Sequence, residues 1–346
     1  MDENRSGELI SILKEAIEPF RKYMRGLRIQ SWIKTIIVVI FAIQGIIFLS
    51  FKTMSGSSSS LSPSISTNSL NSDYPDKDFA SKNVIAVIPV IGVISEGGGK
   101  GGIVETMAEM LDYAGKDPNV KAVILEVQSP GGGVNASNLI WNDIMKFKKS
   151  GKPLVAFFNG IAASGGYYIS APADKIIATP ETLTGSIGVI MQSPDYSGLL
   201  GKVGVKFNTI KSGQQKDMMS PYKPLEKDTE MILQKLVDGA YDRFVKKVAV
   251  GRKMDEKKVR KIADGRIYDS EQALANGLID QMGYMEDSFQ TAKKLAGIKE
   301  ASLVRYSRKA DLFSGLFMKL NLDPLASVKQ QILPSQPGLY YLWTGN

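Results

Sequence analysis

The segment 122-AVILEVQSPGGGVNAS-137 joins a β-branched apolar run to a helical pattern through Ser-Pro and three glycines. An apolar run of this kind is typical of a strand buried on both faces, and glycines permit a tight turn into a helix. Outward from it, strands are predicted at 84–94, 153–158, 174–179, 186–191 and 205–210, and helices at 103–115, 134–149, 223–250 and 269–276. This alternation predicts an α/β domain with a mainly parallel sheet over residues 80–300.

The composition excludes several chemistries. The chain of 346 residues contains no Cys and no His, so thiolate nucleophiles, imidazole bases and Cys/His zinc sites are absent. The net charge is +8, but the basic cluster between Pro19 and Lys34 precedes an apolar run, and acids and bases alternate elsewhere. We therefore expect no nucleic-acid partner.

The amino-terminal third predicts a membrane anchor. Residues 32–51 form a 20-residue apolar stretch, long enough to cross roughly 30 Å of hydrocarbon as a helix. A cleaved signal peptide is the alternative, but no small-x-small cleavage site follows. The basic residues before the stretch place residues 1–31 in the cytoplasm and the rest outside, on the periplasmic side of the cytoplasmic membrane. Residues 52–79 are Ser-rich and predict a flexible linker, and residues 301–346 are assigned to a carboxyl-terminal tail.

Three further segments carry candidate chemistry. In 159-NGIAASGGYYISA-171, Ser164 occupies a predicted strand-to-helix turn followed by Gly165, whose amide is positioned to help bind an oxyanion. In 210-IKSGQQKDMMSP-221, Lys216 follows a predicted strand and is a candidate base. A lysine base must be neutral, and lowering its pKa by about 3 from 10.4 costs about 4 kcal/mol, so the amine has to be desolvated. In 183-LTGSIGVIM-191, Ser186 is placed to orient that base.

Two competing motifs are weaker. The segment 97-GGGKGG-102 fits a dinucleotide-binding GxGxxG, but a run of five glycines in six is unselective. Ser-x-x-Lys occurs at Ser11 and Ser220 without the companion motifs of penicillin-binding enzymes. Neither motif displaces Ser164, Lys216 and Ser186 as the candidate site residues.

The ordered motifs QSPGGGV, AASGGYYIS, TGSIGV and KSGxxKDxxSP resemble the signal peptide peptidase A family of Ser/Lys proteases over residues 80–300. The resemblance implies a Clp protease/crotonase-like fold, hydrolysis of signal peptides or other small exported polypeptides, and assembly into a ring-shaped homo-oligomer. By position, Ser164 is the nucleophile, Lys216 the general base and Ser186 its positioning residue. Gly131 or Gly132, together with Gly165, would form the oxyanion hole.

The family implies no metal or organic cofactor, and its partners here would be peptide substrates and the lipid bilayer. A non-catalytic membrane scaffold that binds extended peptides is the alternative function. Acyl-CoA chemistry on the same fold is disfavoured by the predicted outward location. The aromatic run 338-GLYYLW-343 is expected either to pack in the core or against a subunit, or to enter a neighbouring active site as a substrate mimic.

Overall fold

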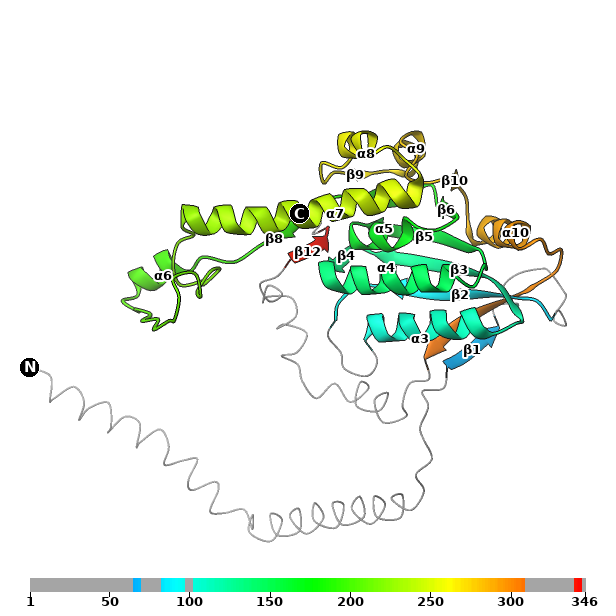
Figure 1. The fold of residues 1–346 in the computed structure, drawn as a ribbon, viewed down its shortest axis with the longest axis horizontal. Coiled ribbons are helices and arrows are strands. Elements are labelled where there is room, and N and C mark those ends of the chain that lie inside the picture. Colours follow the sequence, from blue (N-terminus) through cyan, green and yellow to red (C-terminus); the bar gives the residue numbers. More distant parts are fainter. Residues whose placement is uncertain (1–64, 70–81, 97–101, 309–338, 344–346) are drawn as a thin grey trace, which may run out of the picture. The chain divides into compact units, whose positions relative to one another are not determined.

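A computed structural model describes residues 65–69, 82–96, 102–308 and 339–343 (Figure 1). Its large sheet has the order β1-β11-β2-β3-β5-β6-β10, with β7 paired to β5 and β9 paired to β7. All pairings are parallel except β1 with β11 and β7 with β9. The α/β class with a mainly parallel sheet is therefore confirmed. The strands are β1 (Ile65–Ser69), β2 (Val84–Ile91), β3 (Val120–Ser129), β5 (Leu154–Ala163), β6 (Lys175–Ala178), β7 (Leu183–Gly185), β9 (Ile267–Tyr268), β10 (Gln281–Met282) and β11 (Ser302–Arg308).

Helices cover both faces of this sheet (Figure 1). On one face, α3 (Ile103–Lys116), α4 (Val134–Lys148), α5 (Gly165–Ser170) and α7 (Lys227–Arg252) enclose the larger apolar cluster. On the other, α10 (Met285–Ala296) packs against the smaller cluster. Strand β3 contributes side chains to both clusters, because Leu125 faces the first cluster and Ile124 the second. Two short helices, α8 (Glu256–Ile262) and α9 (Ser270–Ala275), follow α7.

A second, small antiparallel sheet lies beside the first. It consists of β4 (Gly131–Gly133), β12 (Leu339–Leu342) and β8 (Ile190–Met191), with β12 in the middle. Tyr341 pairs with Gly132, and Leu339 pairs with Met191. The carboxyl-terminal strand thus fills the space between two segments that each follow a strand of the main sheet.

Two predicted strands differ from the structure. The strand expected at 186–191 is interrupted, since β7 ends at Gly185, Ser186 adopts a φ of 47°, and pairing resumes only at β8. The strand expected at 205–210 is wrong: the segment is irregular and follows α6 (Ser197–Lys202). Within the described residues this segment pairs with no strand, and Ile210 is fully exposed.

Two predicted boundaries also change. The linker assigned to 52–79 contains β1, whose β-branched Ile65 and Thr67 suit a strand and which pairs with β11. The tail assigned to 301–346 begins with β11, which pairs with β2 and buries Leu303 and Tyr306. Residues 1–31 and the predicted membrane helix at 32–51 lie outside the described residues, and within the described ranges no helix is long and apolar enough to span a bilayer.

Candidate active site

Ser164 lies on a sharp turn between β5 and α5. Its φ of 53° and ψ of −114° belong to a region that residues with a Cβ seldom adopt. The turn is fixed at both ends, because the Ser164 amide donates to the Gly185 carbonyl at 2.8 Å and the Tyr168 amide donates to the Ser164 carbonyl at 2.8 Å. Ser164 is 1% exposed in the isolated chain. This is the strand-to-helix geometry that presents a nucleophilic side chain at the end of a sheet.

The two residues after Ser164 must be glycine for reasons of space. A Cβ on Gly165 would lie 2.7 Å from the Ser137 hydroxyl oxygen, and one on Gly166 would lie 2.8 Å from the Ser129 carbonyl oxygen. The turn therefore packs directly against β3 and α4. Close packing of this kind holds the Gly165 amide in a fixed place.

The glycine strand β4 lies against this turn. Gly131 has a φ of 105°, and a Cβ on it would lie 2.6 Å from the Gly165 nitrogen. Strand β4 is held on its outer side by Ile94, whose amide donates to the Gly131 carbonyl and whose carbonyl accepts from Gly133, both at 2.8 Å. The structure thus brings Gly131, Gly132 and Gly165 together. Because the Gly131 amide donates to the Ser129 hydroxyl at 3.1 Å, the geometry favours Gly132 over Gly131 as the second amide donor.

Strand β12 places a peptide carbonyl at these glycines. The Trp343 amide donates to the Pro130 carbonyl at 2.9 Å, so in the alternating antiparallel ladder the Tyr341–Gly132 pair is also a hydrogen-bonded pair. The Tyr341 carbonyl oxygen is the atom that a Cβ on Gly131 would strike first. A main-chain carbonyl of this chain therefore pairs at Gly132, and both this carbonyl and the Gly165 nitrogen lie close to the place of a Cβ on Gly131.

The Tyr341 side chain fills an aromatic pocket. It is 1% exposed and stacks on Tyr168 with ring centroids 4.9 Å apart. Its ring centroid lies 4.6 Å from that of Phe244. Its hydroxyl donates to the Ala240 carbonyl of α7 at 3.0 Å. Burial raises the pKa of Tyr341 well above its ordinary value and that of Tyr168 to about 12. The pocket thus accepts a neutral aromatic side chain. The sequence prediction described the 338–343 run only as core, subunit contact or substrate mimic and did not identify this pocket.

Ser186 lies close to the turn. Its preceding residue, Gly185, accepts the Ser164 amide, and its own amide donates to the Arg266 carbonyl at 2.8 Å. Ser186 also lines a cavity of about 400 Å³ that reaches Leu342, the residue after Tyr341. The carboxylate-bearing residues Asp238 and Asp264 line the same cavity. The cavity therefore opens next to both the candidate nucleophile and the peptide strand.

Lys216 lies elsewhere in the same chain. It is exposed, and its loop connects α6 to the amino-terminal end of α7, which Figure 1 shows to be remote from α5. The loop is held by Asp217, which accepts from Lys211 at 2.6 Å and from Lys223 at 3.1 Å. Among the described residues no hydrogen bond joins Lys216 to Ser164. The structure brings together the predicted nucleophile, the glycines and Ser186, but it does not bring the predicted base to them within one chain.

An α/β protein with a serine on a glycine-flanked turn, beside converging backbone amides, has the site architecture of a serine hydrolase. Residues 146–299 match the family described as Peptidase family S49. A putative protease of Synechocystis sp. is 39% identical over 225 residues, which are 65% of this chain and 78% of that protein. The chain belongs to peptidase family S49 and, within it, to the signal peptide peptidase A family.

Other relatives are matched over a smaller share of their length. A putative signal peptide peptidase SppA of Enterococcus faecium is 50% identical over 204 residues, 59% of each chain. Protease 4 of Salmonella typhi is 39% identical over 239 residues, 68% of this chain and 38% of that protein. The chain thus spans less than two thirds of the length of these two relatives.

Proposed function

We propose that this protein is a serine endopeptidase that cleaves extended peptides bound as a strand against β4. The observation that carries the proposal is β12, which pairs Tyr341 with Gly132 and so places a peptide carbonyl beside the glycines next to Ser164. A peptide carbonyl held by two amide donors next to a serine is the arrangement that acyl transfer requires. Membership of a peptidase family supports it, as does the Clp protease/crotonase-like fold that goes with the family.

The base in this proposal is Lys216 of a neighbouring copy. The Lys216 loop follows α6 on an arm that exposes apolar side chains, including Val205, Phe207 and Ile210. Apolar side chains gathered on such an arm indicate a surface that another protein covers. A second copy is the simplest occupant, because it would also supply the amine that each chain lacks beside Ser164. Repeating this contact from copy to copy is heterologous and closes into a ring.

The cavity beside Ser186 is the proposed entry for the incoming lysine. Its inner end lies next to the Ser164 turn, and of its two carboxylates Asp264 is already paired with Arg266. Enclosure between two subunits removes water from the amine and favours its neutral form. The Ser186 hydroxyl then accepts or donates a hydrogen bond that orients this amine toward Ser164.

The mechanism follows from these positions. The neutral amine takes the proton of the Ser164 hydroxyl, and the oxygen attacks the peptide carbonyl, whose negative charge the Gly132 and Gly165 amides stabilise. The ammonium then protonates the leaving amine as the carbon–nitrogen bond breaks. Water, activated by the amine, hydrolyses the acyl-enzyme and restores Ser164. The reaction consumes one water for each peptide bond.

Substrates in this proposal are signal peptides or other small exported polypeptides, met at the outer face of the cytoplasmic membrane to which residues 32–51 anchor the chain. The groove supports extended peptides in particular, since it binds β12 by main-chain pairing on both sides. Strand β12 itself would then compete with substrate. It lies in the groove of its own chain; the sequence had left core packing, a subunit contact and a neighbour's active site open.

The test combines labelling with subunit mixing. The full chain in detergent is treated with a fluorophosphonate, and labelling is expected in the wild type but not in Ser164→Ala or Lys216→Ala. Mixing the two inactive variants before assembly is expected to restore about a quarter of wild-type peptide hydrolysis, because random assembly pairs an intact serine with an intact lysine at one site in four. Activity that does not return after verified co-assembly argues against a base supplied by another copy.

A non-catalytic scaffold is the second candidate, and the peptide-binding groove is the observation in its favour. It predicts that labelled extended peptides bind to the full chain and to Ser164→Ala alike, while neither fluorophosphonate labelling nor hydrolysis is detected. Hydrolysis that depends on Ser164 excludes it.

A further inference from the structure

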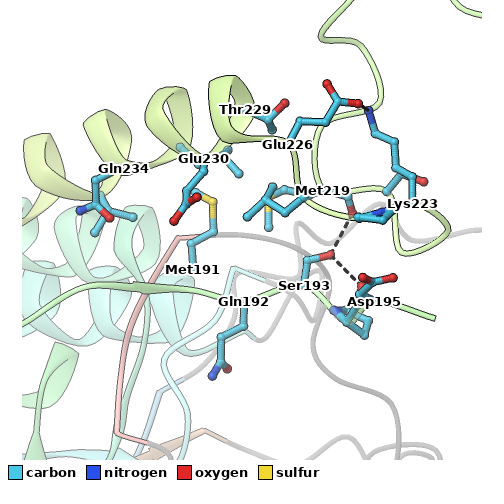
Figure 2. A pocket seen from close by; sticks show the side chains of 16 residues that line it. Met191, Gln192, Ser193, Asp195, Met219, Lys223, Glu226, Thr229, Glu230 and Gln234 are labelled. Atoms are coloured by element: carbon cyan, nitrogen blue, oxygen red, sulfur yellow. Dashed lines mark hydrogen bonds and ion pairs between the residues drawn. The ribbon is translucent and has the colours of Figure 1, made fainter. Parts of the chain in front are cut away.

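A second cavity, of about 470 Å³, continues the groove beyond β8. It is enclosed by Met191 at the end of β8 with residues 192–195 after it, by residues 219–226 after the Lys216 loop, and by the first half of α7 (Figure 2). Its apolar lining includes Met191, Met219, Leu225, Leu233 and Val237. The Ser193 hydroxyl donates to the Met219 carbonyl at 2.9 Å, which ties two of the walls together. The cavity is therefore a built pocket of the described chain.

The register of β12 leads directly into this cavity. Leu339 pairs with Met191 in antiparallel register, so the residues of a bound peptide that precede the Leu339 position run along residues 192–195. Side chains alternate along a strand, and Tyr341 points at Ala240 and Phe244 of α7. The side chains two and four residues before the Tyr341 position therefore face α7 as well.

Spacing selects the fourth residue for the cavity. Two residues of strand span about 6.8 Å, which is about four to five residues of helix at about 1.5 Å each. Moving back along α7 from the Ala240–Phe244 contact, the side chain two residues earlier reaches the level of Val237, at one end of the cavity. Leu339 holds this position and is not among the residues that line the cavity. The side chain four residues earlier reaches the level of Leu233, which lines the cavity.

We infer, on the basis of the proposed function, that this cavity is a distal specificity subsite that binds an apolar substrate side chain four residues before the residue that takes the place of Tyr341. Carboxylates of Asp195, Glu226 and Glu230 stand at its lining, and Lys223 is already paired with Glu226 at 3.2 Å. An acidic side chain would meet both an apolar lining and like charge. The subsite thus selects against Asp at this position and for Leu or a larger apolar residue.

The experiment uses the full chain in detergent and internally quenched peptides that differ only at this fourth position, carrying Leu, Gln or Asp. The kcat/KM for the Leu peptide is expected to exceed that for the Asp peptide by about tenfold, the usual effect of filling one apolar pocket. Leu233→Asp is expected to abolish the preference. Leu236→Asp is the matched control, because Leu236 is exposed on the same helix but does not line the cavity, and it should leave the preference intact.

Three outcomes overturn the inference. Equal cleavage of all three peptides by the wild type does so while leaving the proposed peptidase standing. A change of oligomeric state in Leu233→Asp, with the peptide preference unaltered, would assign the cavity to contact with a second copy. If no peptide is cleaved, the proposed function fails. The subsite is then tested by measuring binding of the Leu and Asp peptides to Ser164→Ala with fluorescence anisotropy. Tighter binding of the Leu peptide than of the Asp peptide then supports the subsite, and equal binding refutes it.

Discussion

Replacement of Tyr341 by alanine tests whether β12 blocks the groove. The Tyr341 ring is 1% exposed and lies between Tyr168 and Phe244. Truncating a buried aromatic side chain to alanine typically removes about 3–5 kcal/mol. If about 3 kcal/mol of this stabilises docking of the strand, the ratio of docked to released strand falls more than 100-fold, because each 1.4 kcal/mol is a factor of ten.

The assay is hydrolysis of an internally quenched peptide by the full chain in detergent. We expect Tyr341→Ala to raise kcat/KM at least about tenfold, and truncation before Gly338 to do the same. Tyr341→Phe loses only the hydrogen bond to Ala240, worth about 1 kcal/mol, and should give an increase of about fivefold. The double variant Ser164→Ala/Tyr341→Ala sets the background. An unchanged or lower kcat/KM in a Tyr341→Ala protein that melts cooperatively would show that β12 does not compete with substrate.

Three further predictions concern the site. Gly131→Ala is expected to lower kcat/KM at least about 100-fold, since its Cβ would displace the Gly165 amide, whereas Gly160→Ala, with a similar φ of 90° but open space around it, should retain activity. Burial raises the pKa of Tyr341, so docking of β12 is fully favoured below the ordinary tyrosine pKa of about 10 and weakens as pH rises above it. Peptide hydrolysis by the wild type should therefore rise further above that pH, and this additional rise should be absent in Tyr341→Phe. Lys211 and Lys223 hold the pKa of Asp217 below its usual range. The two ion pairs of Asp217 are therefore present at neutral pH and are lost only as pH falls through the lowered pKa. Asp217→Asn should reduce hydrolysis about tenfold at neutral pH with a melting temperature almost unchanged, because exposed ion pairs contribute little stability; an equal loss in melting temperature would indicate a structural role instead.

The sequence alone predicted those strands, helices and turns whose conformation depends on residues close together in the chain. The apolar runs at 84–94 and 122–127 and the helical periodicity at 103–115 and 134–149 match β2, β3, α3 and α4 to within a few residues. The glycine-rich turn after β5 was likewise predictable, because only glycine fits beside Ser129 and Ser137. Such features depend on neighbours in the chain or on the absence of a side chain.

Sequence failed where the deciding partner lies far along the chain. Strand β11 enters the sheet because β2, more than 200 positions earlier, offers an edge. The 205–210 segment has strand-like alternation but pairs with no strand among the described residues, so propensity alone misassigned it. The location of Lys216 was also beyond local reasoning, since the motif indicates a lysine in a loop but not how far that loop lies from Ser164 in the folded chain.

The backbone at Ser164 implies a trade-off between stability and activity. A residue with a Cβ held at a φ of 53° and ψ of −114° is destabilising by about 1–3 kcal/mol, and glycine would relieve this. Ser164→Gly should therefore melt several degrees higher than the wild type while losing all hydrolysis, whereas Ser164→Ala, which keeps the Cβ, should be equally inactive without that thermal gain. The fold would then be more durable without its nucleophile than with it.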